Sequence, residues 1–206
     1  MAATRLYLIR HGATNLTAED RFSGETGDLS AEGRAQVARL GERLRGAGIQ
    51  ALYASDLPRA LDSARIIGEA IGLEPRLRED LREIRHGHWE GLTHAEVRSR
   101  DPAEYAAWQS DPFHQAPVGG ESGAAVLARA KPALREIVAA HDGGRVAVVS
   151  HKATLRLLLC DLLGIDPRGY REKLEQAPAC LNALELAAER ARLLQFNDIS
   201  HYATQP

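Results

Sequence analysis

The chain has 206 residues, of which 44% are hydrophobic and 26% charged, and this composition is typical of a globular protein with one substantial core. The formal net charge of −2 gives no electrostatic reason to expect binding to nucleic acid or to a membrane surface. Two cysteines, Cys160 and Cys180, argue against a disulfide framework or a structural zinc site, and the lack of a long apolar run or a signal-peptide layout predicts a soluble cytoplasmic protein.

Apolar runs typical of strands alternate with helical patterns along the chain. This alternation predicts an α/β fold with a largely parallel sheet. Serines that precede helical patterns are expected as N-caps, and glycines that follow them as stops. In chain order we expect a strand at 5–9, a helix from Ser30 to about Gly46 or Gly48, a strand at 50–55, a helix from about Pro58 to Gly72, a helix capped by Ser122, a strand at 145–150, a helix over 155–163 that stops at Gly164, and two late strands at 181–186 and 191–197.

The middle of the chain, from about residue 84 to 121, follows neither pattern. Short helical pieces there alternate with proline and glycine breaks. We interpret this stretch as an insertion over the sheet within a single domain that spans residues 1–206. The two late strands have a short connection and are expected to form a hairpin at the edge of the sheet.

Two of the predicted strands deliver a histidine at their carboxyl end. "LYLIRH" ends in His11 and "VAVVSH" ends in His151. Each histidine alone is equally well explained as a polar strand end. In open α/β sheets, however, ligands bind outside the carboxyl ends of the strands, so the two imidazoles are expected to face one crevice. Gly12, after His11, is expected to let the backbone approach a bound anion closely.

Two arginines belong to the same edge of the sheet. Arg10 adjoins His11, and Arg59 lies in the first turn of the helix that leaves the second strand. Two guanidinium and two imidazole groups have the charge and geometry to hold a tetrahedral dianion, which indicates phosphate chemistry. Glu83 is the candidate acid for a leaving oxygen, and neighbouring cations are expected to keep a nucleophilic imidazole neutral.

These residues resemble the histidine phosphatase superfamily, which includes the cofactor-dependent phosphoglycerate mutases. The resemblance runs through most of the chain in an ordered set of motifs: "RHG" (10–12), "SDLPRALDSA" (55–64), "LREIRHGHWEGLT" (81–93), "GGES" (119–122), "VVSH" (148–151) with Arg156 behind it, and "LNALEL" (181–186). It implies a three-layer α/β/α sandwich and a phosphohistidine intermediate on His11. Arg10, Arg59 and His151 would complete the phosphate pocket, with Glu83 as proton donor and then as base for water. No metal and no cofactor are implied.

The chain departs from the family pattern near the substrate. Ala13 stands where many members carry a carboxylate, Thr17 where asparagine is usual, Ser23 where glutamine is common, and Lys152 where glycine is frequent. The resemblance suggests that Asn182 helps to orient His11. The expected substrate-binding residues, beyond the phosphate pocket, are therefore Asn15, Thr17, Ser23, Gly24, Lys152 and Asn182.

Several functions remain open at this level. The leading hypothesis is a metal-independent phosphomonoesterase that acts on a small phosphorylated metabolite. A phosphoglycerate mutase with the same intermediate is the close alternative, and a non-catalytic module that binds phospho-ligands is a further one. His86 and His88 are an alternative pair of metal ligands, but no carboxylate or cysteine at ligand spacing joins them, so a pair that lines the mouth of the site or is exposed is favoured. The oligomeric state stays open, with a homodimer among the alternatives.

Overall fold

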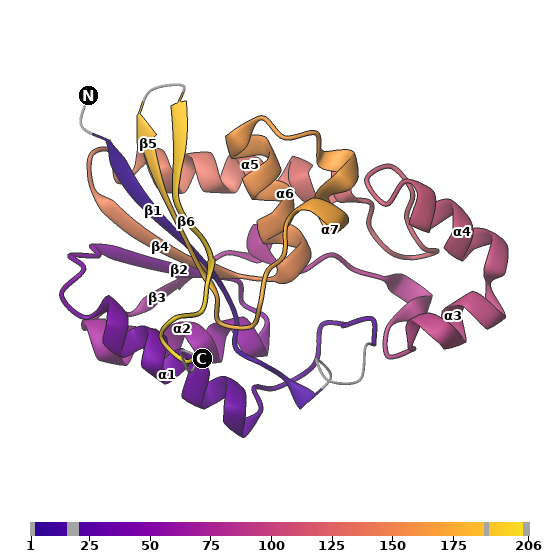
Figure 1. Ribbon diagram of the computed structural model, residues 1–206, viewed down its shortest axis with the longest axis horizontal. Helices are drawn as coiled ribbons and strands as arrows, with labels where there is room; N and C mark the ends of the chain where they lie inside the picture. The colour runs from indigo at the N-terminus through magenta and orange to yellow at the C-terminus, as the bar shows by residue number, and fades with distance from the viewer. Residues whose placement is uncertain (1–2, 16–20, 188–189, 204–206) are drawn as a thin grey trace.

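The computed structural model describes residues 3–15, 21–187 and 190–203, and these form a six-stranded sheet between two layers of helices (Figure 1). The strand order is β3-β2-β4-β1-β5-β6, in which β1 to β4 are parallel and β5 pairs antiparallel with both β1 and β6. The elements are β1 (Thr4–Arg10), α1 (Ala31–Leu44), β2 (Ala51–Ala54), α2 (Pro58–Ile71), β3 (Pro75–Leu77), η2 (Glu79–Leu81), η3 (Gly87–Trp89), α3 (His94–Arg100), α4 (Pro102–Ser110), α5 (Gly123–Ala139), β4 (Arg145–Ser150), α6 (Lys152–Leu163), η4 (Pro167–Gly169), α7 (Tyr170–Lys173), β5 (Leu181–Ala187) and β6 (Arg190–Asp198).

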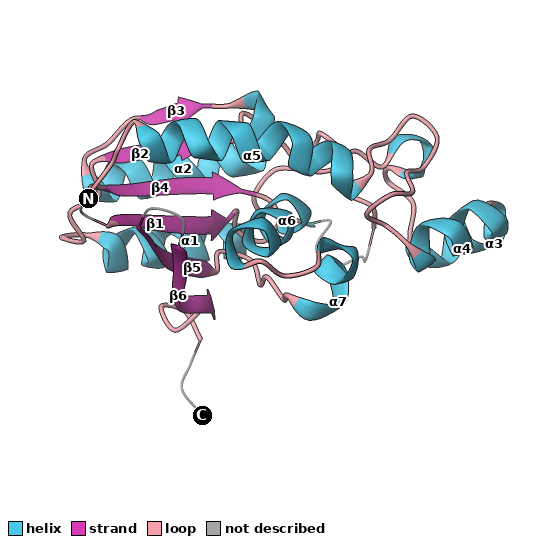
Figure 2. Cartoon of the chain, turned by 90° about the horizontal axis from the view of Figure 1, so that it is seen from above, coloured by secondary structure: helices cyan, strands magenta, loops and turns pink. Residues whose placement is uncertain are grey.

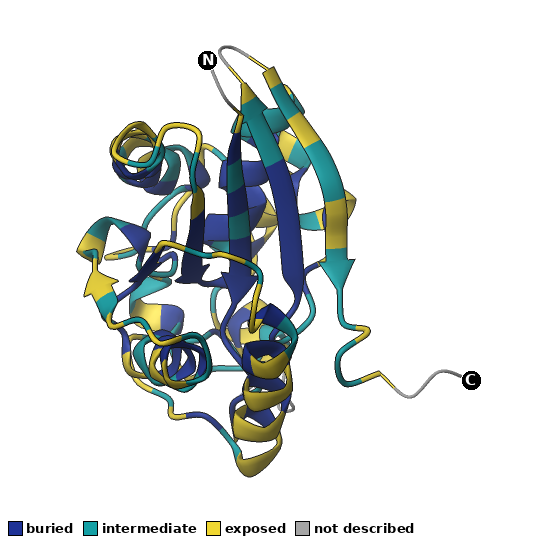
Figure 3. Cartoon of the chain, turned by 90° about the vertical axis from the view of Figure 1, so that its left-hand side faces the viewer, coloured by how far each residue is buried: buried dark blue, intermediate teal, exposed yellow. Residues whose placement is uncertain are grey.

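Each face of the sheet packs against its own layer of helices. Successive strand residues point to opposite faces. On one face, strand residues such as Leu6 and Val148 join a core with α5 and α6. On the other, Ile9 and Val149 pack against α1 and α2. The central strand β4 is accordingly buried from Val146 to Ser150, whereas most residues of the edge strand β6 are exposed or half-buried (Figure 3). The predicted three-layer α/β/α sandwich is confirmed.

The helix ends follow the predicted chemistry. The Ser30 hydroxyl accepts the Gly33 N–H at the start of α1, and the Ser122 hydroxyl accepts the Ala125 N–H at the start of α5. Gly72 and Gly164 end α2 and α6 in the left-handed conformation, which glycine adopts without steric cost. α1 stops at Leu44, slightly before the predicted end, and α6 begins at Lys152, three residues before the predicted start. β5 and β6 pair as the predicted hairpin.

The parallel strands direct their carboxyl ends toward one side of the molecule, where α3, α4 and α7 lie (Figure 2). The segment expected as an insertion carries η3, α3 and α4 there. A small core of its own, built on Trp89, Val97, Tyr105 and Trp108, packs around Phe22. That the whole chain is one domain stays a prediction. None of the helices in the described ranges is long and apolar enough to cross a lipid bilayer.

Candidate active site

The two strand-end histidines lie side by side. β1 and β4 are neighbours in the sheet, with Arg10 opposite Ser150, and the His11 N–H donates to the Ser150 carbonyl at 3.0 Å. The imidazole rings of His11 and His151 are 5.1 Å apart between centroids and tilted by 58°. Both side chains are buried. The expectation that separate strands bring two imidazoles to one place is thus met by the pairing of two central strands.

The hydrogen bonds of His11 define which ring nitrogen carries the proton. Nδ1 lies 2.7 Å from the carbonyl oxygen of Gly12, which can only accept, so Nδ1 is protonated in the neutral ring. Nε2 then holds the lone pair. Burial lowers the pKa of His11 well below its ordinary value, and the charges of Arg10 and Arg59 lower it further. The neutral imidazole is therefore the form present near neutral pH.

His151 is fixed by a different contact. Its Nε2 lies 2.8 Å from the hydroxyl oxygen of Ser55, at the end of β2, while its buried Nδ1 has no partner among the described residues. Burial, followed by the charge of Arg59, lowers the pKa of His151 well below its ordinary value. Ser55 was not predicted as a site residue, although its place at the end of the neighbouring strand is the same signal that identified the histidines.

Each of the two arginines uses one nitrogen of its guanidinium group to donate hydrogen bonds to the protein backbone. Arg10 Nη1 donates to the Gln176 carbonyl at 2.7 Å, and Arg59 Nη1 donates to the carbonyls of Gly24 and Thr26, both at 3.1 Å. Within the described part of the chain, Arg10 Nε and both Arg59 Nε and Nη2 are buried and without a hydrogen-bond partner. Buried donors are nearly always paired, so these three N–H groups indicate a site for an acceptor-rich anion.

Glu83 lines the same cavity as His11 and the two arginines. Its carboxylate oxygens accept the N–H groups of Ala153 and Thr154, at 3.2 Å, in the first turn of α6. The residues that share one cavity of about 240 Å³ are Arg10, His11, Arg21, Phe22, Ser23, Arg59, Glu83, Ile84, His86, His94, Trp108, Lys152, Ala153, Arg156, Tyr170 and Arg171. The volume is below the roughly 300–1,000 Å³ of pockets for drug-sized ligands, which fits a small metabolite.

Comparison with known proteins assigns the family. The chain matches the model of the histidine phosphatase superfamily (branch 1) over residues 6–199. The chain belongs to this superfamily. It is 40% identical to the bifunctional protein Rv2228c of Mycobacterium tuberculosis over 91% of its own length but only 52% of the relative's, so it spans about half the length of that protein. It is 37% identical to the glucosyl-3-phosphoglycerate phosphatase of M. tuberculosis, covering 79% of this chain and 77% of the relative. The solved structure of Bacillus stearothermophilus YhfR superposes with a TM-score of 0.90 at 32% identity, covering 97% of this chain and 99% of the other.

The residues at which this histidine phosphatase superfamily member departs from the family pattern fall into different places. Ser23 and Lys152 line the cavity, beside the basic and aromatic residues of its wall. Gly24 lies on the wall of an adjacent cavity of about 220 Å³, which Glu83 also lines, and its carbonyl is engaged by Arg59. Gly24 therefore contributes a contact that orients an arginine.

Two predicted ligand contacts, Asn15 and Asn182, are not brought to the cavity, and a third falls outside the described ranges. Asn15 is exposed and does not line it, and Thr17 lies outside the described residues. Asn182 is fully buried, where its amide exchanges hydrogen bonds with the Gln176 side chain at 2.7 and 3.0 Å. Among the described residues, Asn182 makes no hydrogen bond to His11, so a role in orienting that histidine stays a prediction. Because the backbone carbonyl of Gln176 accepts from Arg10, Asn182 is connected to Arg10 through Gln176.

Gly12 has a packing role that was not predicted, while the predicted close approach to a bound anion stays a prediction. A Cβ atom at this position would lie 2.5 Å from the carbonyl oxygen of Gly33 and 2.8 Å from Cγ2 of Val37. Such contacts are shorter than van der Waals packing allows. The residue after His11 therefore has to be glycine, because Gly33 and Val37 of α1 pack directly against its backbone.

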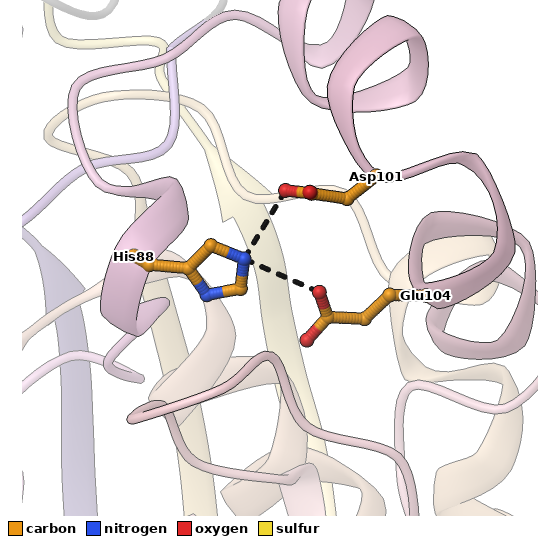
Figure 4. Close-up of side chains that lie close together, drawn as sticks. All are labelled: His88, Asp101 and Glu104. Atoms are coloured by element: carbon orange, nitrogen blue, oxygen red, sulfur yellow. Dashed lines mark hydrogen bonds and ion pairs between the residues drawn. The ribbon is translucent and has the colours of Figure 1, made fainter.

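His86 and His88 separate in the structure. His86 lines the cavity, and burial lowers its pKa to about 4. His88 is exposed, and its Nε2 lies 3.1 Å from Asp101 Oδ2 and 3.2 Å from Glu104 Oε2, with both carboxylates directed at the imidazole (Figure 4).

The expectation that no carboxylate joins this histidine pair is therefore wrong for His88, because α4 brings in two. The three atoms are arranged as metal ligands could be. Asp101 Oδ2, however, also accepts from Trp89 Nε1 and from the Arg100 guanidinium. Glu104 Oε1 accepts the Val118 N–H. The carboxylates of this cluster thus already have cationic and N–H partners, and the cluster ties η3 to α4.

Proposed function

We propose that the protein is a metal-independent phosphomonoesterase that hydrolyses a small phosphorylated metabolite through a phosphohistidine on His11. One observation carries the proposal: Arg10 and Arg59, which have three buried donor nitrogens without a partner among the described residues, line the same cavity as a neutral imidazole whose Nε2 holds its lone pair. A phosphoryl group supplies the oxygens that these donors lack. The family assignment and the relative that is named as a glucosyl-3-phosphoglycerate phosphatase support a phosphatase reaction.

In the first half of the reaction, His11 Nε2 forms a bond to phosphorus while the bond from phosphorus to the ester oxygen breaks. Glu83 enters this step protonated and gives its proton to the leaving oxygen, which departs as an alcohol. Arg10 and Arg59 donate to the equatorial oxygens, where charge has to be stabilised in the transition state, and a neutral His151 lies beside them.

In the second half, the Glu83 carboxylate takes a proton from water as the water oxygen attacks phosphorus. The phosphorus–nitrogen bond breaks, inorganic phosphate leaves, and His11 and the protonated Glu83 are restored. The fixed guanidinium groups supply the positive charge that a metal ion supplies in other phosphatases. This charge makes a metal unnecessary in the proposed mechanism.

The partner in this proposal is a small phosphorylated metabolite. The cavity is small, and the net charge of −2 offers no general attraction for nucleic acid or for an anionic membrane. Cytoplasmic location and a homodimer stay predictions.

The test is the release of inorganic phosphate from a panel of small phosphomonoesters by wild type, His11→Asn and His114→Asn. His114 is an exposed histidine paired with Asp111 on the insertion and serves as the matched control. We expect His11→Asn to lose about 10⁴-fold or more in turnover, because it removes the nucleophile, and His114→Asn to match wild type. Because the phosphorus–nitrogen bond of a phosphohistidine is cleaved by acid and survives alkali, the reaction with a ³²P-labelled substrate is quenched in alkaline detergent; labelled protein should be trapped in wild type and absent in His11→Asn.

Two results would overturn the proposal. Isomer formation from 3-phosphoglycerate without phosphate release would identify a mutase. Tight binding of phosphoesters with no turnover by wild type would identify a non-catalytic binding module.

A further inference from the structure

The cavity carries more positive charge than one phosphoryl group requires. Beyond Arg10 and Arg59, its wall includes Lys152, Arg156 and Arg171. Lys152 and Arg156 come from the first turns of α6, and Arg171 comes from α7. Glu83 is the one carboxylate among the described residues that line this cavity. Arg21 also lines the cavity, but it is paired with Glu96. Lys152, Arg156 and Arg171 therefore face a space that no described carboxylate other than Glu83 lines.

Arg171 differs from Lys152 and Arg156 in its partners. Within the described residues its guanidinium makes no hydrogen bond or ion pair, and it lies 4.0 Å from the ring centroid of Trp108. Stacking on an aromatic ring orients a guanidinium while leaving its in-plane N–H groups free to donate. The contact between Trp108 on α4 and Arg171 on α7 thus places a guanidinium group at the wall of the cavity, oriented to donate hydrogen bonds.

Lys152 and Arg156 both bind a carboxylate of the protein itself. Lys152 Nζ lies 3.2 Å from Oε1 of Glu175, and Arg156 Nη2 lies 3.1 Å from Oε2 of the same carboxylate. The Glu175 side chain is 62% exposed. The Lys152 side chain is 39% exposed, and an exposed ion pair contributes only about 0.2–1 kcal/mol, so a competing carboxylate can displace Glu175 from Lys152. Burial and the nearby charges of Arg156 and Arg10 lower the pKa of Lys152, which shows that this cation lies in a field that an additional anion would relieve.

We propose that Lys152 and Arg171 form a second anion subsite that binds a carboxylate on the same small molecule whose phosphoryl group lies against His11. The substrate class is thus a phosphorylated carboxylic acid, held at both ends. This inference rests on the proposed phosphatase function. In the absence of substrate, Glu175 occupies part of the cationic group that the substrate carboxylate would use.

The test compares substrates that differ by the carboxylate. O-Phosphoserine and O-phosphoethanolamine are one such pair, and 3-phosphoglycerate and glycerol 3-phosphate are a second. We expect wild type to favour the carboxylate of at least one pair by about tenfold to a hundredfold in kcat/KM, the range for a hydrogen bond between charged groups. Lys152→Gln and Arg171→Gln should each reduce that ratio toward one.

Arg168→Gln is the matched control. Arg168 lies three residues from Arg171, pairs with Asp166 and does not line the cavity, so this variant should keep the wild-type ratio. Glu175→Gln provides a test in the opposite direction. Because it removes the resident carboxylate, we expect kcat/KM for the favoured carboxylate substrate to rise by about 1.4-fold to fivefold. A residue with a purely structural role would not give such a gain.

The outcomes separate the two proposals. Hydrolysis of p-nitrophenyl phosphate by wild type, with ratios near one for both substrate pairs, would overturn the second subsite and leave the phosphatase function standing. A wild-type preference that survives in Lys152→Gln and Arg171→Gln would also overturn it. Absence of p-nitrophenyl phosphate hydrolysis together with no turnover of either pair would overturn the phosphatase function and the subsite that rests on it.

Discussion

The two ends of the cavity are built in different ways. At the phosphate end, His11 and His151 are the residues that follow β1 and β4, and the ladder between these strands fixes their backbones. At the far end, Trp108 and Arg171 lie on α4 and α7, outside the sheet, and they meet through one contact between side chains. The first arrangement is set by the central fold, whereas the second depends on short peripheral helices.

This difference separates chemistry from selectivity. A group that acts on every phosphomonoester has to keep the same position whatever the rest of the substrate is, and paired central strands provide that. Groups that read the rest of the substrate can change with the peripheral segments while the sheet stays the same. Substitutions at the phosphate end should therefore reduce the turnover of every substrate, whereas those at the far end should change the preference between substrates.

The largest effect is expected at the phosphate end, from Arg59→Met. The variant removes two unpartnered N–H groups that would contact the phosphoryl oxygens, and we expect kcat/KM to fall by about 10²–10³-fold for every substrate alike. Steady-state kinetics on p-nitrophenyl phosphate, O-phosphoserine and O-phosphoethanolamine would measure it. Because Arg59 also holds the loop at Gly24 and Thr26, the unfolding midpoint of the variant should be recorded in parallel. A loss confined to carboxylate substrates would contradict the division between the two ends.

An intermediate effect is expected on stability, from the histidines buried at the phosphate end. In the folded protein the pKa values of His11 and His151 lie well below the ordinary value of about 6.5. As the pH is lowered below 6.5, these histidines therefore become protonated in the unfolded chain while they stay neutral in the folded protein. The free energy of unfolding should therefore fall as the pH is lowered from 6.5.

His11→Gln removes one of these protons. Below pH 6.5, the slope of unfolding free energy against pH should decrease by up to about 1.4 kcal/mol per pH unit. Urea denaturation of wild type and variant at several pH values between 7 and 5 provides the measurement. Identical slopes for the two proteins would show that His11 gains its proton as easily in the folded state as in the unfolded one.

The smallest effect is expected in the insertion, from His88→Asn. This change breaks the contacts with Asp101 and Glu104 on a half-exposed surface, and we expect a loss of at most about 1 kcal/mol in unfolding free energy. Phosphate release should match wild type, and treatment of wild type with a chelator should leave it unchanged. Loss of activity in either experiment would instead support the alternative of a metal centre at His88.

The parts of the fold that the sequence predicts are those with strong local signals. The buried central strands stand out as apolar runs, and Ser30, Ser122, Gly72 and Gly164 mark helix ends through their own backbone chemistry. β3 was not predicted, because its three residues lie at the edge of the sheet, two of them exposed, so they show no apolar pattern. α7 was missed for a similar reason, since four residues are too few for a helical period.

The same limit applies to the candidate site. His11, His151 and Arg59 are predictable because the carboxyl edge of a parallel sheet gathers whatever follows its strands. Arg171 has no such signal, because its place depends on how α7 packs against α4. Asn182 shows the reverse problem. In sequence, a polar side chain that contacts a ligand looks the same as one whose partners are all protein atoms.

Both sheet neighbours of β1 come from the last third of the chain, β4 from residues 145–150 and β5 from residues 181–187. The strand that ends at His11 is therefore synthesised before both of its neighbours and is fully paired only after both have been made. Until about residue 187 has emerged, β1 cannot have both of its neighbours, and its apolar residues remain open to incorrect association. Activity during synthesis should consequently arise only once nearly the whole chain is available, so nascent chains that end before β5 should be inactive.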